Sequence, residues 1–406
     1  MVCCRARWVL PISVPPIPDG WITIDNGRIV ARGGRDPVSV DGGEAVLDLG
    51  DVAVLPGLVN AHTHLELSYL RGRVPSSASL VSWVRALMAE RRASPDSAAP
   101  EILRGVHDGI TEAMASGTAV VGDITNSLIT AQDLSKSGLA GMIFHELIGF
   151  SPADPAAMVE RACQAVVDLK LADGLRSTLA AHAPYSVAPS IFRMMPPAIR
   201  RRGLSGCSVH LAESAEEMQF IRSGEGPWRQ LLEDFGVWNA EWTAPGVSPV
   251  EYLDEQGFLN AQVLVVHGVH MSGADLTTLR ARGTTLVTCP RSNRHTGAGV
   301  PPIDRFYESG VAVAVGTDSL ASTPDLNLFS ELADMHALAP ALPPSTLLES
   351  ATAVGARALG VADHGTIEPG QRARLIAVAV PRGVDDVEEY LVSGIEPAQV
   401  QWVKVE

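Results

Sequence analysis

The sequence predicts an α/β protein: a (β/α)8 TIM barrel with a small β-sandwich domain built from both termini. Three observations lead to this prediction. Eight apolar, β-rich runs alternate with helical patterns through the middle of the chain. Short strands and turns occupy both ends. Histidine or aspartate closes five of the eight runs, and a closed barrel would gather those ends at one mouth.

The terminal segments predict one composite domain, residues 1–54 plus 363–406, and residues 55–362 form the predicted catalytic barrel. An Asp-Asn-Gly turn at residues 25–27 separates two strand-like runs. The stretch "GTIEPGQRARLIAVAVP" near the carboxyl end has the same short-strand texture.

The eight predicted barrel strands are short apolar runs rich in β-branched residues. They are 52–60, 119–123, 141–146, 178–182, 207–211, 263–267, 285–289 and 311–317. Helical patterns separate most of them; the pattern at 154–174 begins with Asp-Pro and closes on a glycine. A doubly wound open sheet is the alternative, but its distant strands would not bring their terminal histidines together.

Composition sets limits on the kind of partner. The 406 residues are 46% hydrophobic and 19% charged, as in a globular, core-rich chain. A net charge of −15 argues against nucleic acid or an anionic membrane as a partner, and no apolar run reaches membrane-spanning length. The five cysteines form no CxxC pair, so a reducing, cytoplasmic setting is expected. We expect a small-molecule substrate; the oligomeric state, a homodimer included, stays open.

The stretch "LPGLVNAHTHLELS" places His62 and His64 two positions apart at the end of the first run. Alternate strand residues face the same side, so both imidazoles would face one point, although an exposed edge strand would show the same pattern. His210 and Asp318 end two other runs. Together these four side chains suit one divalent metal with a position left for water. Zinc is the expected ion, although iron and manganese accept the same ligands, and no lysine ends a strand to bridge a second metal.

Two further residues suit hydrolysis at such a metal. Glu213 lies three residues after His210, where a carboxyl group could reach both a water on the metal and a substrate nitrogen. His267 ends its run and can hydrogen-bond the attacking oxygen; a swap of roles with His270 stays open. HExxH, Walker A, GxSxG and the PCxxC deaminase signature are all missing from the sequence.

With these residues in place, the chain resembles the amidohydrolase superfamily, in the branch of cytosine, guanine and adenosylhomocysteine deaminases and triazine hydrolases. The matching motifs run in order: "PGLVNAHTHLE", "AHAPYSVAP", "VHLAES", "VVHGVHMS" and "VAVGTDSLAS". The resemblance implies metal ligation by His62, His64, His210 and Asp318. It also makes Glu213 the proton shuttle, Asp318 the acceptor of the water proton and His267 the holder of the attacking oxygen. It also makes His182 face the substrate. Glu66, Arg291 and Ser319 are further candidate substrate-binding residues, although the loop that carries Arg291 could instead simply be pinned by it.

Two motifs narrow the resemblance. "HTHLELS", which contains Glu66, and "CPRSNRHTGAG" are most similar to deaminases that act on 6-aminodeoxyfutalosine in menaquinone biosynthesis. The implied reaction is hydrolytic loss of the 6-amino group as ammonia. Alternatives are an adenosylhomocysteine, methylthioadenosine or guanine deaminase, a triazine-type chlorohydrolase or amidohydrolase, and a non-catalytic barrel. Glu213 favours deamination, because a departing amine needs a proton and chloride does not.

Several cationic side chains are expected at the barrel mouth. They are Arg71, Arg73, Arg291, Arg294 and His295, and a rim of this kind suits a substrate carboxylate. The alternative for each arginine is an ion pair with the chain's many acidic residues. For Glu66 the alternative is a structural carboxylate.

Overall fold

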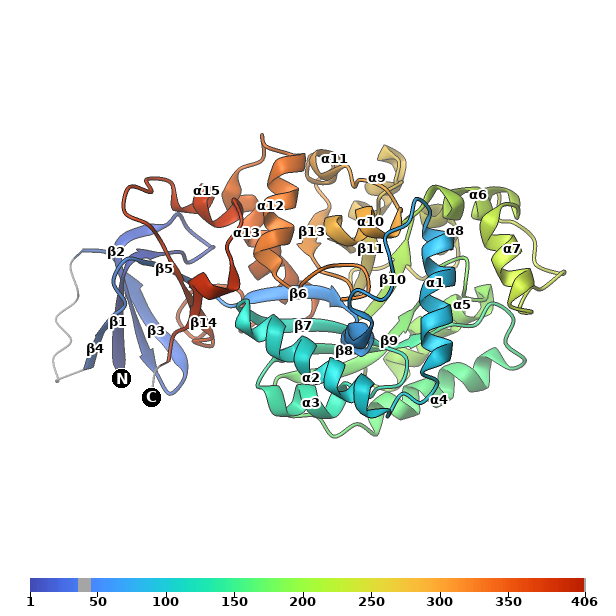
Figure 1. Cartoon of the computed structure of the whole chain (residues 1–406), viewed down its shortest axis with the longest axis horizontal. Helices are drawn as coiled ribbons and strands as arrows, with labels where there is room; N and C mark the ends of the chain where they lie inside the picture. Colours follow the sequence, from blue (N-terminus) through green and yellow to red (C-terminus); the bar gives the residue numbers. More distant parts are fainter. Residues whose placement is uncertain (36–44, 405–406) are drawn as a thin grey trace.

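Eight parallel strands form the centre of the computed structural model, which describes residues 1–35 and 45–404 (Figure 1). Their hydrogen-bonded order follows the sequence, which confirms the (β/α)8 barrel. In chain order they are β6 (Leu58–Thr63), β7 (Thr118–Thr125), β8 (Ala140–Leu147), β9 (Leu175–Ala181), β10 (Cys207–Leu211), β11 (Val263–His267), β12 (Thr285–Thr288) and β13 (Ala312–Val315).

Helices surround the barrel and bury the outer faces of its strands. They are η1 (Leu65–Leu70), α1 (Leu80–Ala93), α2 (Pro100–Ala115), α3 (Ala131–Ser137), α4 (Pro155–Val167), α5 (Pro189–Arg201), α6 (Ala215–Ser223), α7 (Pro227–Asp234), α8 (Pro249–Glu255), α9 (Gly273–Arg282), α10 (Pro290–Thr296), α11 (Ile303–Glu308), α12 (Leu328–Leu338), α13 (Pro344–Glu349), η2 (Ser350–Val354) and α14 (Gly355–Ala358). Strands β7 and β10 are buried at every position, as expected of parallel strands covered on both faces. Among the described residues, no helix is long and apolar enough to cross a membrane.

Helix α4 shows how local sequence sets an element. The Asp154 carboxylate accepts a hydrogen bond from the Ala157 N–H (2.9 Å), and Pro155 occupies the first helical position. The helix ends before the glycine that its pattern suggested. Leu169 and Leu171 instead pack against the barrel as the chain returns to β9.

Individual hydrogen bonds rather than a strand ladder close the barrel between β13 and β6. The Asn60 amide donates to Thr317 Oγ1 (2.7 Å) and accepts from the Thr317 N–H (3.1 Å). The Asp318 N–H then donates to the His62 carbonyl (3.1 Å). A Cβ at Gly316 would lie 2.7 Å from that carbonyl oxygen, so only glycine allows this approach. Closure therefore places Asp318 directly against His62.

The two chain ends build a mixed seven-stranded sheet beside the barrel, drawn in blue and red in Figure 1. Its strands are β1 (Val2–Val9), β2 (Ile17–Asp25), β3 (Arg28–Gly33), β4 (Ala45–Asp48), β5 (Val52–Pro56), β14 (Leu375–Ala379) and β15 (Val400–Trp402), and α15 (Val387–Val392) and η3 (Pro397–Gln399) lie between the last two. Asn26 and Gly27 both adopt positive φ in the β2–β3 turn, as the Asp-Asn-Gly signal predicts. The core joins Ile22 and Val54 to Leu375.

The run expected as one strand at 52–60 is two strands in different sheets. Strand β5 pairs antiparallel with β14, and β6 opens the barrel. The chain passes between the sheets at Gly57, where a Cβ would lie 2.5 Å from the Ala119 Cβ. This crossing is buried and carries no polar turn, so the sequence shows an uninterrupted apolar run. Strand β5 crosses the expected 54/55 boundary, and residues 36–44 and 405–406 of the expected terminal domain lie outside the described residues.

Candidate metal-dependent active site

Four predicted ligands meet at the carboxyl end of the barrel. His210 Nε2 lies 3.3 Å from His62 Nε2, and Asp318 Oδ1 lies 3.8 Å from His62 Nε2 and 3.5 Å from His64 Nε2. Ligand atoms placed tetrahedrally about 2.1 Å from a zinc-sized ion are about 3.4 Å apart. The donor set therefore fits one divalent ion.

Burial keeps the ligand imidazoles neutral, as metal binding requires. Desolvation lowers the pKa of His62 well below its ordinary value and that of His64 and His210 to about 4. His210 Nδ1 lies 2.9 Å from the His182 carbonyl oxygen, which only accepts, so Nδ1 is protonated and Nε2 faces the other ligands. Burial also raises the pKa of Asp318, and a hydrogen bond from Ser292 Oγ (2.6 Å) to Oδ2 opposes that rise.

Glu213 and His267 face each other beside these ligands. Glu213 Oε1 lies 3.6 Å from His267 Nε2. Burial, and then the charge of Asp318, raises the pKa of Glu213 well above its usual range, so this carboxyl group can carry a proton near neutral pH. The Asn293 amide nitrogen donates to His267 Nδ1 (3.0 Å), which leaves the imidazole proton on Nε2. His267 holds this position with a φ of 76°, a strained conformation of the kind found at functional sites.

Glu217, which sequence reasoning missed, anchors the turn that carries Glu213. Its carboxylate is fully buried and accepts the N–H groups of Ala212 and Glu213, each at 2.9 Å. Ser214 Oγ accepts from the Glu217 N–H (3.2 Å). The Ser-x-x-Glu spacing at 214–217 is a capping-box signal and could have marked this residue. Only the fold shows that its carboxylate accepts hydrogen bonds from Ala212 and Glu213, the two residues that precede the helix cap Ser214.

His182 and Ser319, both expected at the substrate, have different surroundings. His182 is half-buried at the end of β9, with its ring centroid 5.1 Å from that of His210 and Nδ1 2.6 Å from Ser186 Oγ. Ser319 is buried, and its hydroxyl contacts Ser322 Oγ (3.2 Å), which also bonds to Asp318. His182 therefore borders the ligand set, whereas Ser319 lies behind Asp318.

Glu66 takes the structural role that the sequence left as its alternative. Its Oε2 accepts from the Thr125 hydroxyl and from the N–H groups of Asn126 (3.0 Å) and Ser127 (3.1 Å). Its Oε1 lies 3.7 Å from Arg91 Nη2. Because Oε2 accepts three hydrogen bonds and Oε1 lies beside the Arg91 guanidinium, the Glu66 carboxylate holds the loop after β7. This arrangement counts against the expected contact with substrate.

The arginines of the expected cationic rim are paired within the protein. Arg291 is half-buried, and its guanidinium donates to Glu331 (2.7 Å) and Asp325 (2.8 Å) and to two backbone carbonyls. These bonds occupy most of its donors, so the expected substrate-binding role is corrected to pinning the loop after β12. The other pairs are Arg71–Glu112, Arg73–Glu101 and Arg294–Asp334, and His295 Nε2 lies 3.1 Å from the Val74 carbonyl oxygen.

A second missed carboxyl group is that of Glu146 at the end of β8. Its Oε1 lies 3.8 Å from His210 Nδ1, and its charge acts to raise the pKa of His64 and His210 against the dominant effect of burial. Its neighbour in the strand is His145. Because adjacent strand residues face opposite sides, only one of the two can enter the mouth.

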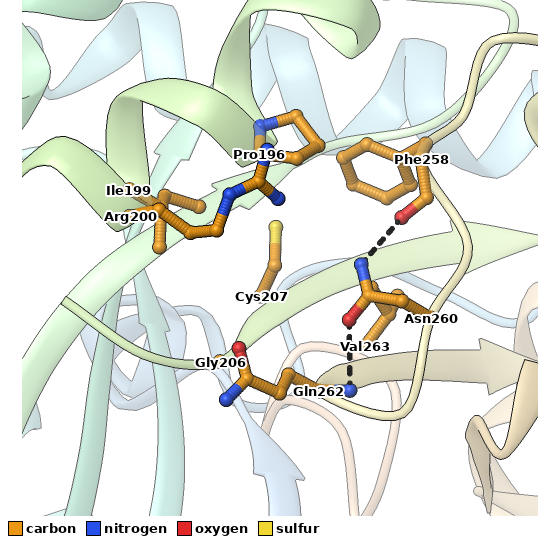
Figure 2. Close-up of a pocket in the computed structure, with 9 residues that line it drawn as sticks. All are labelled: Pro196, Ile199, Arg200, Gly206, Cys207, Phe258, Asn260, Gln262 and Val263. Carbon is orange, nitrogen blue, oxygen red and sulfur yellow. Dashed lines mark hydrogen bonds between the residues drawn. The ribbon is translucent and has the colours of Figure 1, made fainter.

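A small cavity at the opposite end of the barrel is separate from this site. It lies at the first residues of β10 and β11, whereas the site lies at their last residues. Figure 2 shows its lining, in which Cys207 points toward Arg200 and Phe258. Burial raises the pKa of the Cys207 thiol to about 12, which keeps it protonated near neutral pH.

Comparisons with known proteins agree with the geometry. The model of the amidohydrolase family matches residues 53–401. A 5-methylthioadenosine/S-adenosylhomocysteine deaminase of Pelotomaculum thermopropionicum is 29% identical over 402 residues, covering 95% of this chain and 87% of its own. The crystal structure of an adenosine deaminase from Xanthomonas campestris with bound zinc has a TM-score of 0.82 at 26% identity, with 98% of this chain and 90% of that chain covered. Helicobacter pylori aminofutalosine deaminase with methylthio-coformycin has a TM-score of 0.87 at 24% identity, covering 100% and 98%, and shows the shared fold.

Proposed function

The chain belongs to the amidohydrolase family, and from that premise we propose that it is a metal-dependent hydrolytic deaminase of adenine-type nucleosides. The observation that carries the proposal is the position of Glu213, a buried carboxyl group with a raised pKa beside the four side chains His62, His64, His210 and Asp318. The relatives named as methylthioadenosine/adenosylhomocysteine and adenosine deaminases support the same reaction class.

The metal would be held by His62, His64, His210 and Asp318, with zinc as the proposed ion. A divalent ion in this position supplies a hydrolytic nucleophile near neutral pH by lowering the pKa of a bound water. Glu213 donates a proton to a ring nitrogen of the heterocycle as oxygen adds to the amino-bearing carbon. His267, with its proton on Nε2, hydrogen-bonds the oxygen that adds. Asp318 takes up one proton of the water. Glu213 then moves the other from the added oxygen to the amino group, which leaves as ammonia, and the Asp318 proton returns to Glu213.

Proton supply distinguishes deamination from displacement of chloride. Chloride leaves without a proton, whereas an amine must be protonated before it leaves. The raised pKa of Glu213 gives the site a proton donor at the right place. We therefore place amine release ahead of triazine dechlorination for this chain.

The finer substrate assignment is 6-aminodeoxyfutalosine, in menaquinone biosynthesis. Its support is the "HTHLELS" and "CPRSNRHTGAG" motifs. The cationic rim no longer adds to it, because its arginines are paired with acidic residues. We expect kcat/KM for 6-aminodeoxyfutalosine to exceed that for adenosine, methylthioadenosine and adenosylhomocysteine.

An ammonia-release assay over these four nucleosides, guanine and a chlorotriazine tests the proposal. The blank is the Glu213→Gln variant loaded with the same metal. We expect ammonia from at least one adenine nucleoside with the wild-type protein and very little with the variant. Chloride release from the triazine without any nucleoside deamination would overturn the proposed reaction. A tenfold preference for adenosine or adenosylhomocysteine, about 1.4 kcal/mol, would overturn only the finer assignment.

A further inference from the structure

The imidazole of the ligand His64 has no hydrogen bond that orients it among the residues that the structure describes. His210, by contrast, donates from Nδ1 to the His182 carbonyl oxygen (2.9 Å). Ligand histidines are normally oriented by a bond of this kind, from the ring nitrogen that does not face the metal. The direction of the His64 imidazole must therefore be set through its backbone.

The backbone at His64 belongs to neither a strand nor a helix. Strand β6 ends at Thr63 and η1 begins at Leu65, and His64 between them has φ −121° and ψ 81°. Strand β6 pairs with its neighbour β7 (Figure 1) in a register that shifts between Asn60 and Thr63. Neither a regular ladder nor a helical turn fixes this segment, so another contact has to hold the peptide that follows His64.

Asp123, near the end of β7, supplies that contact. Its Oδ1 accepts from the Leu65 N–H (3.0 Å), and its Oδ2 accepts from Thr130 Oγ1 (2.6 Å). Asp123, Thr130 and Leu65 are all fully buried. The first N–H groups of a helix have no partner within it, so a side chain from elsewhere in the fold can accept from one. The carboxyl group of Asp123 therefore fixes the N–H group next to His64, and Thr130 fixes the carboxyl group.

Glu66 binds the same two segments in the opposite direction. Its carboxylate, on η1, accepts from the Thr125 hydroxyl of β7 and from the Asn126 N–H (3.0 Å) of the following loop. The residues on both sides of His64 are thus tied to the end of β7. We propose that Asp123 is a positioning residue that directs the His64 imidazole to the metal; this inference rests on the metal site of the proposed function.

The test compares the zinc affinity of Asp123→Ala with that of Asp275→Ala. Asp275, at the start of α9, is the matched control because it is also a buried carboxylate that accepts from a backbone N–H, that of Ser272 (2.8 Å), and from hydroxyls. Each metal-free protein is titrated with zinc in competition with a chromophoric chelator, and urea unfolding of the metal-free proteins records their stability. We expect Asp123→Ala to raise the Kd for zinc by about tenfold to a hundredfold, as for other residues that orient metal ligands. Asp275→Ala should lose stability and keep the wild-type Kd.

Asp123→Asn should restore zinc binding, because its amide oxygen can still accept from Leu65 and its nitrogen can donate to Thr130. The visible absorption of Co²⁺ bound in place of zinc gives a second readout, which depends on the geometry of the ligands and not on stability. This spectrum should change in Asp123→Ala and match the wild type in Asp123→Asn and Asp275→Ala.

Equal zinc affinities and cobalt spectra for Asp123→Ala and Asp275→Ala would overturn the inference. The packing of Leu65 against Val106 and Ile110 would then be enough to place His64. If Asp123→Ala does not fold, Thr130→Val decides: loss of the hydrogen bond to Oδ2 should raise the Kd for zinc by about threefold, and an unchanged Kd contradicts the inference. A wild-type protein that binds no zinc would instead count against the proposed function.

Discussion

Replacing Glu217 with alanine should destabilise the protein and lower turnover by displacing Glu213, the proposed proton shuttle. The metal should stay bound. The carboxylate is fully buried and accepts the N–H groups of Ala212 and Glu213, each at 2.9 Å. A buried donor left without a partner costs about 1–3 kcal/mol. Two such donors predict a loss of about 2–6 kcal/mol in the free energy of unfolding. Ala212 has a φ of 50°, so the freed turn should relax and carry Glu213 away from His267.

Urea unfolding of the metal-loaded protein, elemental analysis and ammonia release measure these three effects. Glu216→Ala is the control, because within residues 1–35 and 45–404 that neighbouring carboxylate accepts only from Ser79 Oγ (2.9 Å), a half-buried contact worth about 1 kcal/mol. We expect Glu217→Ala to keep one metal per chain, since His210 is held by β10, and to lose at least about tenfold in kcat. A Glu217→Ala protein that matches Glu216→Ala in unfolding free energy and in turnover would refute the anchoring role.

Three other outcomes are expected. Glu213→Gln should keep the metal and the fold, and its kcat should fall by about 10²–10⁴, as for other general acids and bases, in the ammonia assay; near-normal turnover would assign the shuttle to another residue. His210→Ala should lose metal by elemental analysis, whereas His267→Asn should keep metal and lose rate; the reverse pattern would exchange their roles. Burial raises the pKa of Asp123 from 3.8 to about 7. Between about pH 4 and 7 the folded chain therefore keeps a proton on Asp123 that the unfolded chain releases. The free energy of unfolding should fall as the pH rises through this range. Asp123→Asn should remove about 4 kcal/mol of that decline in urea titrations, and an unchanged slope would contradict the shift.

The barrel and its metal ligands could be predicted from the sequence because both depend on local sequence patterns. Apolar runs define strands, and polar side chains at run ends must meet when the barrel closes. This reasoning placed His62, His64, His210 and Asp318 together. In the structure His62 Nε2 lies 3.3 Å from His210 Nε2 and 3.8 Å from Asp318 Oδ1, which is 3.5 Å from His64 Nε2. The same reasoning misplaced the first barrel strand because the crossing at Gly57 is buried and carries no turn signal.

Residues whose role depends on distant partners could not be predicted in the same way. The sequence around Arg291 does not show whether its guanidinium binds a substrate anion or Glu331. The packing of α12 against α10 brings Glu331 to Arg291, and this contact is visible only in the folded structure. Glu146 lies in β8 and Asn126 directly follows β7, so their contact forms only when these two strands pair. The sequence therefore supports the reaction class more firmly than the recognition of the rest of the substrate.

Titration of the metal-free protein with zinc, followed by ammonia release from the preferred adenine nucleoside, tests the central claim most directly. Four ligand atoms spaced for a single ion predict that the rate rises linearly and reaches its plateau at one equivalent per chain. A plateau at two equivalents, or ammonia release that does not depend on added metal, would contradict a mononuclear metal-dependent deaminase.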